Sequence, residues 1–392
     1  MKKLIFFLLI ITNIVFWLGY LIIVDRMKVD LNNNVKKYNY QEVNFSYDAK
    51  VIEAANKLFL DDTRVDKIAK EMSLEQKVSQ LFFVSPPSDY LSEIDLQFFE
   101  KNSVGGVYFG PRNISSEGAL RSLIEALDPK LKTKAFYSTD QEGASVIRLW
   151  WDQSLAGPFY LSTNDTPIVA YYYGKVRTDA FRAVGLNFNF APVMDLQYDG
   201  SYLYLRSLSY DAKKVSKLGG EIIKGQQDGG VITAMKYFPG TGSSKVDPKK
   251  SLTEINLDKS ELAFADILPF KENFSIADAI ITSHAKYPKI DSENQVTFSK
   301  IFITNILKEE YGYKGLIITD DLSSASITDG TKYKKAFIAG HDMLLSSAPL
   351  GEIEDGIKSI IDAVNAGELT EDRVFESVFK IIKFKQKYSL LK

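Results

Sequence analysis

Residues 231–240 read VITAMKYFPG, in which Lys236 directly follows the apolar run VITAM. Seven further runs of similar length and apolar character occur along the chain. They are QLFFV from residue 80, VGGVYFG from 104, KAFYSTD from 134, NFNFAPVMD from 187, AIITSHA from 279, GLIITDD from 315 and DMLLSS from 342. Short continuous apolar runs are typical of strands that are buried on both faces. The sequence therefore predicts eight strands.

Amphipathic segments separate these runs. Residues 211–227 (DAKKVSKLGGEIIKGQQ) and 299–311 (SKIFITNILKEEY) carry apolar residues at three- and four-residue spacing, which predicts helices. The last segment, DRVFESVFKIIKFKQKYSLL, predicts a closing helix whose apolar stripe lies against the rest of the domain. That stripe consists of Val374, Val378, Ile381 and Ile382. Alternation of strand and helix, repeated eight times, predicts an α/β fold of the (β/α)8 TIM-type barrel class.

The composition suits one large folded domain. The chain has 392 residues, of which 45% are hydrophobic and 12% aromatic, enough to bury a large core. Its net charge of −2, with both signs interspersed, gives no basic stripe, so we expect no nucleic-acid partner. The absence of cysteine excludes disulfides and thiolate metal sites. With only two histidines, His284 and His341, a multi-histidine metal site is not expected.

The N-terminus predicts a membrane anchor. Lys2 and Lys3 precede an uncharged run from Leu4 to Val24, which would span roughly 30 Å as a helix. This run is longer than the apolar region of a signal peptide, about 7 to 15 residues, so residues 1–28 are predicted to be an uncleaved transmembrane signal-anchor. A cleaved signal peptide is the alternative. The lysines before the span place the rest of the chain outside the cytoplasm, at the cell surface or in the periplasm.

The segment after the predicted anchor is polar. Residues 29–57 are rich in Asn, Lys and Tyr, and we interpret them as a stalk or linker. Residues 58–392 then form the predicted barrel domain. The sequence gives no indication of an oligomeric state.

Polar residues follow five of the apolar runs. Catalytic residues of β/α barrels project from the C-terminal ends of the strands, so residues at these positions are candidates for a site. A single one of them could equally be a strand-end cap, but five together predict a functional site at that end. The five are Asp140, Asp195, Lys236, His284 and Asp320.

Five motifs in order along the chain resemble a known family. They are DQEGASVIR at 140–148, NFAPVMD at 189–195, LRSLSYD at 205–211, GLIITDDL at 315–322 and AGHDMLLSS at 339–347. Over roughly residues 73–391 the chain resembles glycoside hydrolase family 3 of the β-N-acetylhexosaminidase type. The resemblance implies a retaining glycosidase of the one-domain branch, without the second domain of the two-domain β-glucosidases. It implies a carbohydrate substrate, such as a β-linked N-acetylglucosamine glycoside of the cell wall, and no cofactor.

The resemblance also implies roles for individual residues. The first aspartate of GLIITDDL is the family's nucleophile, which assigns that role to Asp320 and makes Asp321 a non-catalytic neighbour. Four residues match the family's sugar-binding positions, so the resemblance implies that they bind the sugar. They are Asp140, Arg148, Arg206 and Lys236. Ser145 stands where the family has an arginine. His284 matches a position that lines the sugar site, and a hydrogen-bonded structural histidine is the alternative.

The loop KYFPGTGSSKVDPKK at 236–250 resembles the family's KHFPGHGD…DSH loop but lacks both histidines. Tyr237 replaces the sugar-binding histidine, and Lys249 replaces the acid/base histidine, two residues after the dyad aspartate Asp247. An unperturbed lysine titrates near pKa ~10.4, and we expect Asp247 to raise the pKa of Lys249 further. Lys249 would then be a weak acid for the first step and a poor base for the second.

Three functions are compatible with this sequence. The first is a slow or altered glycosidase in which Glu142, Glu254 or a carboxylate on a nearby loop supplies the proton. The second is a non-catalytic, membrane-tethered, sugar-binding pseudoenzyme. The third is an unrelated barrel enzyme that uses Lys236 or Lys249 as a Schiff-base nucleophile. Trp150 and Trp151 either stack on a sugar ring or cover the rim of the barrel.

Overall fold

The computed structural model describes residues 62–152, 154, 157–164 and 166–391. The anchor predicted for residues 1–28 and the stalk predicted for residues 29–57 lie outside the described residues. Within the described ranges, no helix is both long enough and apolar enough to cross a bilayer.

Eight short strands form one parallel sheet, and each lies within one of the eight apolar runs, so the predicted strands are confirmed. Nearly all of their residues are buried, as expected for parallel strands that helices surround. The strands are β1 (Phe82–Val84), β2 (Gly106–Tyr108), β3 (Phe136–Thr139), β4 (Phe188–Asn189), β5 (Ile232–Phe238), β6 (Ala279–Thr282), β7 (Leu316–Thr319) and β8 (Leu344–Ser346).

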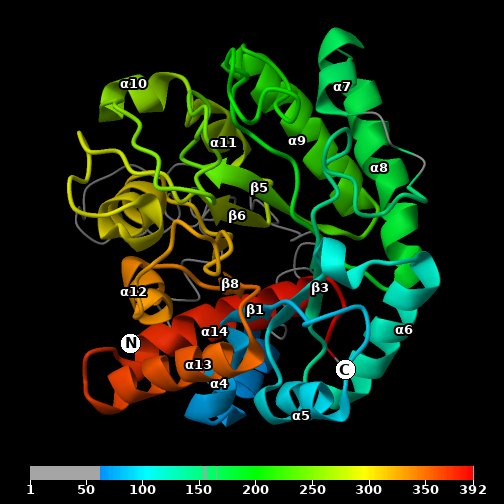
Figure 1. Cartoon of the computed structure of the whole chain (residues 1–392), viewed down its shortest axis with the longest axis vertical. Helices are drawn as coiled ribbons and strands as arrows, with labels where there is room; N and C mark the ends of the chain where they lie inside the picture. The colour runs from blue at the N-terminus through cyan, green and yellow to red at the C-terminus, as the bar shows by residue number, and fades with distance from the viewer. Residues whose placement is uncertain (1–61, 153, 155–156, 165, 392) are drawn as a thin grey trace, which may run out of the picture. The chain divides into compact units, whose positions relative to one another are not determined.

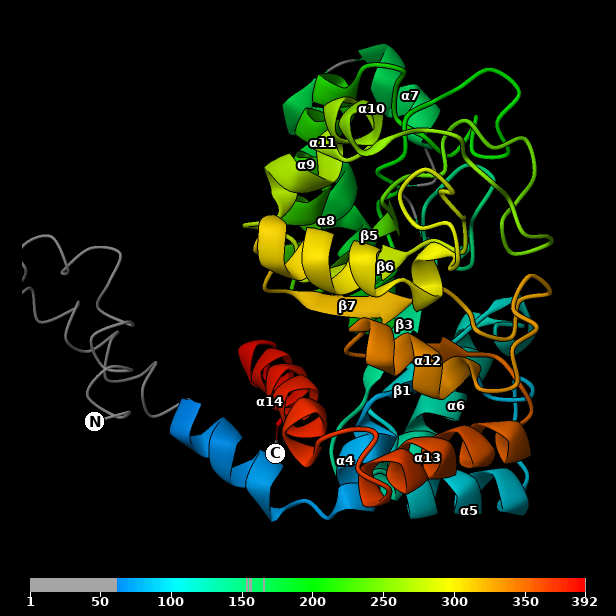
Figure 2. The same cartoon turned by 90° about the vertical axis from the view of Figure 1, so that its left-hand side faces the viewer.

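The sheet closes on itself. Each strand from β1 to β6 pairs with the next strand along the chain, and β1 also pairs with β8. The remaining neighbours, β7 and β8, meet at a seam. Across the seam between β7 and β8, Ile318 bridges Met343 in parallel, and the Thr319 N–H donates to the Met343 carbonyl at 3.1 Å. The helices surround these strands (Figures 1 and 2), so the predicted (β/α)8 barrel class is confirmed.

Helices connect successive strands. The two segments between strands that were predicted to be helices are helical. Residues 211–227 correspond to α9, and residues 299–311 contain a π-helix, η4. The main helices are α4 (Leu74–Gln80), α5 (Glu93–Asn102), α6 (Glu117–Leu127), α7 (Pro158–Asn164), α8 (Pro167–Val184), α9 (Ala212–Asp228), α10 (Lys259–Phe264), α11 (Leu268–Asn273), η4 (Ile301–Glu310), α12 (Lys332–Ala339), α13 (Leu350–Asn365) and α14 (Glu371–Lys387). Three short 3-10 turns are η1 (Pro111–Asn113), η2 (Asp128–Lys130) and η3 (Val296–Phe298).

Helix α14 covers the N-terminal end of the barrel (Figure 2). Its predicted apolar stripe is fully buried, which confirms that prediction. Its lysines reach groups that directly precede strands: Lys380 donates to the Gly315 carbonyl at 3.2 Å, and Lys387 to Asp278 at 2.6 Å. The opposite, C-terminal end of the strands is the end at which the predicted site lies.

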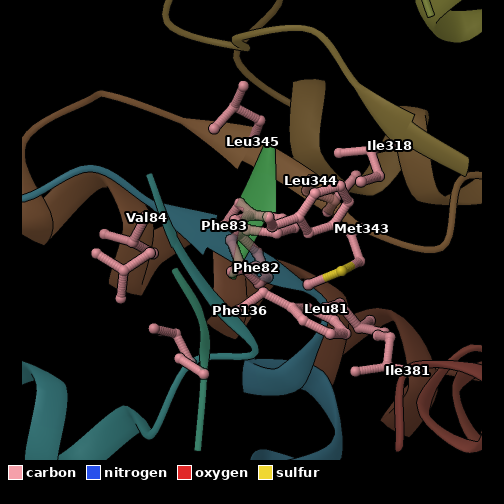
Figure 3. Close-up of a cluster of buried hydrophobic side chains, with 14 of the residues drawn as sticks. Leu81, Phe82, Phe83, Val84, Phe136, Ile318, Met343, Leu344, Leu345 and Ile381 are labelled. Carbon is pink, nitrogen blue, oxygen red and sulfur yellow. The ribbon is translucent and has the colours of Figure 1, made fainter. Parts of the chain in front are cut away.

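Aromatic rings fill part of the core. The Phe83 ring lies 5.3 to 6.0 Å from the rings of Phe136, Phe188 and Phe190, measured between centroids. Figure 3 shows Phe83 and Phe136 within this buried cluster. Gly106 on β2 leaves room for the Phe83 ring, because a Cβ atom there would lie only 2.2 Å from it. The close packing of the core fixes the strands, and hence the residues at their ends.

Candidate active site

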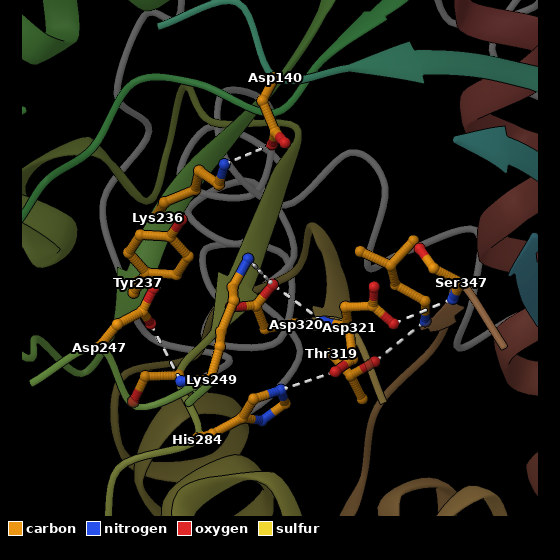
Figure 4. Close-up of polar contacts among 12 residues, drawn as sticks. Asp140, Lys236, Tyr237, Asp247, Lys249, His284, Thr319, Asp320, Asp321 and Ser347 are labelled. Atoms are coloured by element: carbon orange, nitrogen blue, oxygen red, sulfur yellow. Dashed lines mark hydrogen bonds and ion pairs between the residues drawn. The ribbon is translucent and has the colours of Figure 1, made fainter. Parts of the chain in front are cut away.

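The strand-end residues predicted from the sequence converge at one end of the barrel. Asp140 directly follows β3, Lys236 lies in β5, and Asp320 directly follows β7. Lys236 Nζ donates to Asp140 Oδ1 at 2.5 Å (Figure 4). It also donates to Glu142 Oε1 at 2.9 Å. All four side chains are buried. Parallel strands in a closed barrel bring these distant sequence positions together.

A network of paired charges surrounds Lys236. Arg206, in the loop before α9, binds Glu142 through two nitrogens at 2.7 Å each and also donates to the Tyr237 hydroxyl at 2.7 Å. Arg148 Nη2 lies 3.8 Å from Asp140 Oδ2. All of the sugar-binding candidates named from the sequence except His284 thus lie in one connected cluster. Such a set of fixed donors and acceptors suits a ligand with several hydroxyl groups.

The carboxylates of this network are ionised. Burial alone would raise their pKa values, but at Asp140 the cations Lys236, Lys249 and Arg148 together outweigh burial and keep its pKa far below the ordinary range. Burial also opposes ionisation of Glu142, whereas Arg206 and Lys236 lower its pKa to about 2. Glu142 therefore does not fit the role of substitute proton donor.

The second substitute considered from the sequence, Glu254, lies apart from this network. Its side chain is 59% exposed, and its nearest cation is Lys286 Nζ at 3.8 Å. Neither glutamate is thus identified as the substitute proton donor considered from the sequence.

Lys249 and Asp320 form an ion pair at the centre of the site. Lys249 Nζ lies 2.9 Å from Asp320 Oδ1, and the Asp320 side chain is only 5% exposed (Figure 4). Burial raises the pKa of Asp320, but Lys249 and the groups around it together outweigh burial and lower that pKa below the ordinary value. Burial lowers the pKa of Lys249, but Asp320, together with Tyr237 and Asp140, outweighs burial and raises that pKa well above the ordinary value. Asp320 is thus a carboxylate and Lys249 an ammonium at neutral pH.

Asp247 does not pair with the Lys249 side chain, which corrects the expectation drawn from the sequence. Its Oδ1 instead accepts a hydrogen bond from the backbone N–H of Lys249 at 3.0 Å (Figure 4). The Asp-Pro-Lys segment turns back on itself, so the Asp247 carboxylate supports the loop. The raised pKa of Lys249 comes from Asp320, with further contributions from Tyr237 and Asp140.

The lysines do not fit Schiff-base chemistry, which needs an amine with a lowered pKa. Burial lowers the pKa of Lys236, but Asp140 and the other acidic neighbours more than reverse this and raise it. Lys249 behaves in the same way. Both ammonium groups are held by carboxylates.

Asp195 holds the loop after β5 rather than a ligand. Its Oδ2 accepts from the Tyr237 N–H at 2.9 Å, and its Oδ1 accepts from the Thr241 hydroxyl at 2.9 Å and from the Thr241 N–H. The carboxylate thereby fixes the start of the loop that carries Lys249. The sequence left open that a single strand-end residue could be a cap rather than part of the site. Asp195 acts as such a cap.

His284 is a buried structural residue next to the nucleophile candidate. Its Nε2 lies 3.0 Å from the Asp321 carbonyl, and its Nδ1 lies 2.6 Å from the Thr297 hydroxyl. Burial lowers the pKa of His284, so the ring is neutral, with Nε2 donating to the carbonyl. Asp321 in turn accepts from the backbone N–H groups of Ser323 and Ser347. These contacts position the segment that carries Asp320.

Tyr108 is a site residue that the sequence reasoning missed. Its hydroxyl donates to Asp140 Oδ2, and its ring stacks on Phe190 with centroids 5.6 Å apart. It is the last residue of β2, so the strand-end rule that found Asp140 would have found it too. Trp150 is 63% exposed, and Trp151 Nε1 donates to the Ala180 carbonyl of α8 at 3.4 Å, so Trp151 lies against that helix.

Within the described part of the chain, no group of three or more His, Asp or Glu residues is placed to hold a metal ion. The described side chains of the site supply its charged and polar groups. They provide one buried carboxylate with an adjacent cation, beside a network suited to sugar hydroxyls.

Comparison with known proteins gives a consistent result. The sequence model described as "Glycosyl hydrolase family 3 N terminal domain" matches residues 73–384. Beta-hexosaminidase A of Pseudoalteromonas piscicida is 28% identical over 326 residues, which cover 74% of this chain and 54% of that protein. Beta-hexosaminidase of Hydrogenovibrio crunogenus is 30% identical over 255 residues, which cover 62% of this chain and 71% of that protein.

A solved structure is also similar. It is a glycoside hydrolase family 3 β-N-acetylglucosaminidase from Paenibacillus sp. str. FPU-7, with a TM-score of 0.78 and 28% identity. The match covers 81% of this chain and 63% of that chain. The present chain thus spans about half the length of the Pseudoalteromonas protein and under two thirds of the Paenibacillus structure.

Proposed function

Because the chain belongs to glycosyl hydrolase family 3, through the N-terminal domain of that family, we propose that it is a retaining β-N-acetylhexosaminidase-like glycosidase with Asp320 as its nucleophile. The observation that carries the proposal is the buried Asp320 carboxylate at the end of β7, which Lys249 keeps ionised. Lys249 Nζ and the backbone N–H of Asp321 both contact Oδ1. Among the described contacts, this leaves Oδ2 as the oxygen for attack.

The first step of the proposed mechanism forms a glycosyl ester. Asp320 attacks the anomeric carbon, the bond to the leaving oxygen breaks, and the sugar becomes attached to the carboxylate. Lys249 is the group placed to donate a proton to the leaving oxygen. Its raised pKa makes it a weak acid, so leaving groups that need little protonation react fastest.

The second step needs an acceptor for the sugar. In hydrolysis the acid/base group takes a proton from water as water attacks the ester. An ammonium with a raised pKa holds no free electron pair for that proton. We therefore expect hydrolysis of the ester to be slower than its formation, by the factor of about 10²–10⁴ that general base catalysis typically contributes.

The charged network supports binding of the sugar. Asp140, Lys236 and Arg148 offer alternating acceptor and donor groups at fixed positions, and Glu142 with Arg206 holds them in place. The names of the relatives favour a β-linked N-acetylhexosamine as substrate. Where the family loop has a histidine, this chain has Tyr237, whose phenol oxygen accepts a hydrogen bond from Arg206 at 2.7 Å.

Turnover of an activated substrate tests this proposal. The full chain is mixed with dinitrophenyl β-N-acetylglucosaminide, and phenolate release is followed against the Asp320→Asn and Asp321→Asn variants. We expect a burst of phenolate equal to the enzyme concentration, followed by a slow steady state. The burst should be absent from Asp320→Asn and present in Asp321→Asn. Binding of the glycoside without release in the unmodified protein would favour a sugar-binding protein without catalysis.

The site of action outside the cytoplasm is also a proposal, and it rests on the sequence of residues 1–28 alone. Membrane fractionation with external protease treatment of intact cells tests it. We expect the protein in the membrane fraction, with its barrel accessible to the protease. Protein that stays in the soluble cytoplasmic fraction would contradict it.

A further inference from the structure

Arg148 is a cation of the site that its neighbours leave without a full set of partners. Its Nη2 lies 3.8 Å from Asp140 Oδ2, a distance too long for a hydrogen bond. Its Nε is buried and has no hydrogen-bond partner among the described residues. Arg206, by contrast, donates three hydrogen bonds of 2.7 Å, two to Glu142 and one to the Tyr237 hydroxyl. Because 22% of the Arg148 side chain is exposed, a ligand in the site can reach the guanidinium.

The carboxylate nearest to Arg148 is already occupied by other donors. Asp140 Oδ1 accepts from Lys236 Nζ at 2.5 Å, and Asp140 Oδ2 accepts from the Tyr108 hydroxyl. Lys236, Lys249 and Arg148 all lower the pKa of this one carboxylate. Three cations therefore share the single negative charge of Asp140.

The charged cluster as a whole has one more cation than it has carboxylates. Its ion pairs join four cations to three carboxylates. They are the cations Arg148, Arg206, Lys236 and Lys249 and the carboxylates Asp140, Glu142 and Asp320. Since Glu142 is held by Arg206 and Lys236, and Asp320 by Lys249, the cation with the fewest close contacts is Arg148.

Other carboxylates near the site do not supply the missing charge. Asp195, Asp247 and Asp321 each accept hydrogen bonds from backbone N–H groups. Among the described residues, none of the three forms an ion pair with a cation of the cluster. Their contacts support the loops, so they leave the excess positive charge at Arg148 in place.

This excess charge distinguishes a neutral sugar from an anionic one. A sugar that fills the site displaces water from the guanidinium, and a cation that loses water without gaining a counter-charge costs free energy. A carboxylate or sulfate offers two oxygens that match the planar fork of an arginine side chain. We propose that the sugar bound at this site carries an anionic substituent, a carboxylate or a sulfate ester, which pairs with Arg148. The inference rests on the proposed function and names the class of sugar that the site prefers.

Binding of matched sugars tests this inference. The full chain is titrated by calorimetry with N-acetylglucosamine and with three charged sugars: its 6-sulfate, the corresponding C6 uronic acid, and N-acetylmuramic acid. We expect the preferred charged sugar to bind about tenfold or more tightly than N-acetylglucosamine, as one charged, two-point contact contributes. Which of the three binds tightest distinguishes a sulfate from a carboxylate. The preference should shrink as salt is raised, because the guanidinium is partly exposed.

Three variants assign the preference to Arg148. Arg148→Gln keeps donors but removes the charge, and it should bind charged and neutral sugars about equally. Arg148→Lys restores the charge without the fork and should recover part of the preference. Lys250→Gln changes an exposed lysine in the loop after β5 and should keep the full preference.

Two results would overturn this inference: charged sugars that bind no more tightly than N-acetylglucosamine, or a preference that survives unchanged in Arg148→Gln. Either result leaves the proposed nucleophile intact if the burst of phenolate is observed. A chain that binds none of the four sugars and gives no burst would overturn both the inference and the proposed function.

Discussion

The residue at position 249 determines the pH range over which the site carries the charges that the first step needs. Lys249 carries a pKa raised well above its ordinary value of 10.5, and Asp320 a pKa lowered below its ordinary value of 3.8. Both groups are therefore in the charge state needed for the first step from acidic to alkaline pH. A histidine at this position would change its charge near pKa ~6.5 instead.

We predict that the rate of phenolate release in the burst is flat between about pH 6 and 8 in the unmodified protein. Lys249→His should introduce an inflection in the dependence of the burst rate on pH within this range. It should also raise the steady-state rate, because a neutral imidazole can act as a base. Burst and steady-state rates across the pH range measure this. A steady state in Lys249→His that is no faster than in the unmodified protein would contradict the role given to position 249.

Glu142 stabilises the folded protein as the partner of two buried cations. We predict that Glu142→Gln lowers the free energy of unfolding by about 3–5 kcal/mol, because Arg206 and Lys236 lose a buried counter-charge. Urea unfolding at pH 7 measures it. Glu310→Gln, which breaks an exposed pair with Lys259, should cost less than about 1 kcal/mol. Equal effects of the two substitutions would contradict this account.

The strands and helices were predictable from sequence because each signal is local. A run such as LIIT is apolar throughout since parallel strands are buried on both faces, and the residue after it, Asp320, faces the site by the geometry of the barrel. The contacts of the loops were not predictable in this way. Asp247 was expected beside the Lys249 ammonium, but the path of the loop turns its carboxylate to the backbone. The pairing of Glu142 with Arg206 likewise depends on how two separate loops pack.

Helix α14 carries a buried lysine at the closed end of the barrel. Lys385 Nζ donates to Gln80 Oε1 at 2.7 Å and lies 5.4 Å from the centroid of the Phe136 ring. Burial lowers the pKa of Lys385 to about 7 from its ordinary value of 10.5. Between these two values the unfolded chain binds more protons than the folded one, so this lysine makes stability rise with pH.

We predict that Lys385→Met stabilises the protein at pH 7 by about 1 kcal/mol or more, because an apolar side chain replaces a buried amine that must lose its charge or its hydration. Between pH 7 and 10, the stability of the variant should also rise less than that of the unmodified protein, because the variant lacks the contribution of Lys385. Melting temperatures across that range measure both effects. A lower melting temperature at pH 7 would show that the bond to Gln80 outweighs the cost of burial.

At the scale of the whole molecule, the barrel depends on the seam between β7 and β8. Asp342, just before β8, accepts from the Ile317 N–H of β7 at 3.0 Å and from Lys380 of α14 at 2.7 Å. It also accepts from the Ser377 hydroxyl at 2.9 Å. One buried carboxylate thus connects both sides of the seam to the helix that covers the end of the barrel.

We predict that Asp342→Asn lowers the free energy of unfolding by about 3–5 kcal/mol, because it leaves Lys380 without its buried counter-charge. The surface substitution Asp66→Asn, which breaks the pair with Lys70, should change it by less than about 1 kcal/mol. Unfolding by urea, followed by circular dichroism, measures both. If Asp342→Asn unfolds at the same urea concentration as the unmodified protein, the seam does not depend on this carboxylate.

The central claim is that Asp320 attacks the sugar, and locating the covalent adduct tests it most directly. The protein is quenched in acid during the burst with dinitrophenyl β-N-acetylglucosaminide, digested, and its peptides are sequenced by mass spectrometry. The account predicts one sugar residue attached to Asp320 in the peptide that contains LIITDDL, in the unmodified protein and in Asp321→Asn. A sugar attached to any other residue, or none on a protein that releases phenolate in a burst, would contradict it.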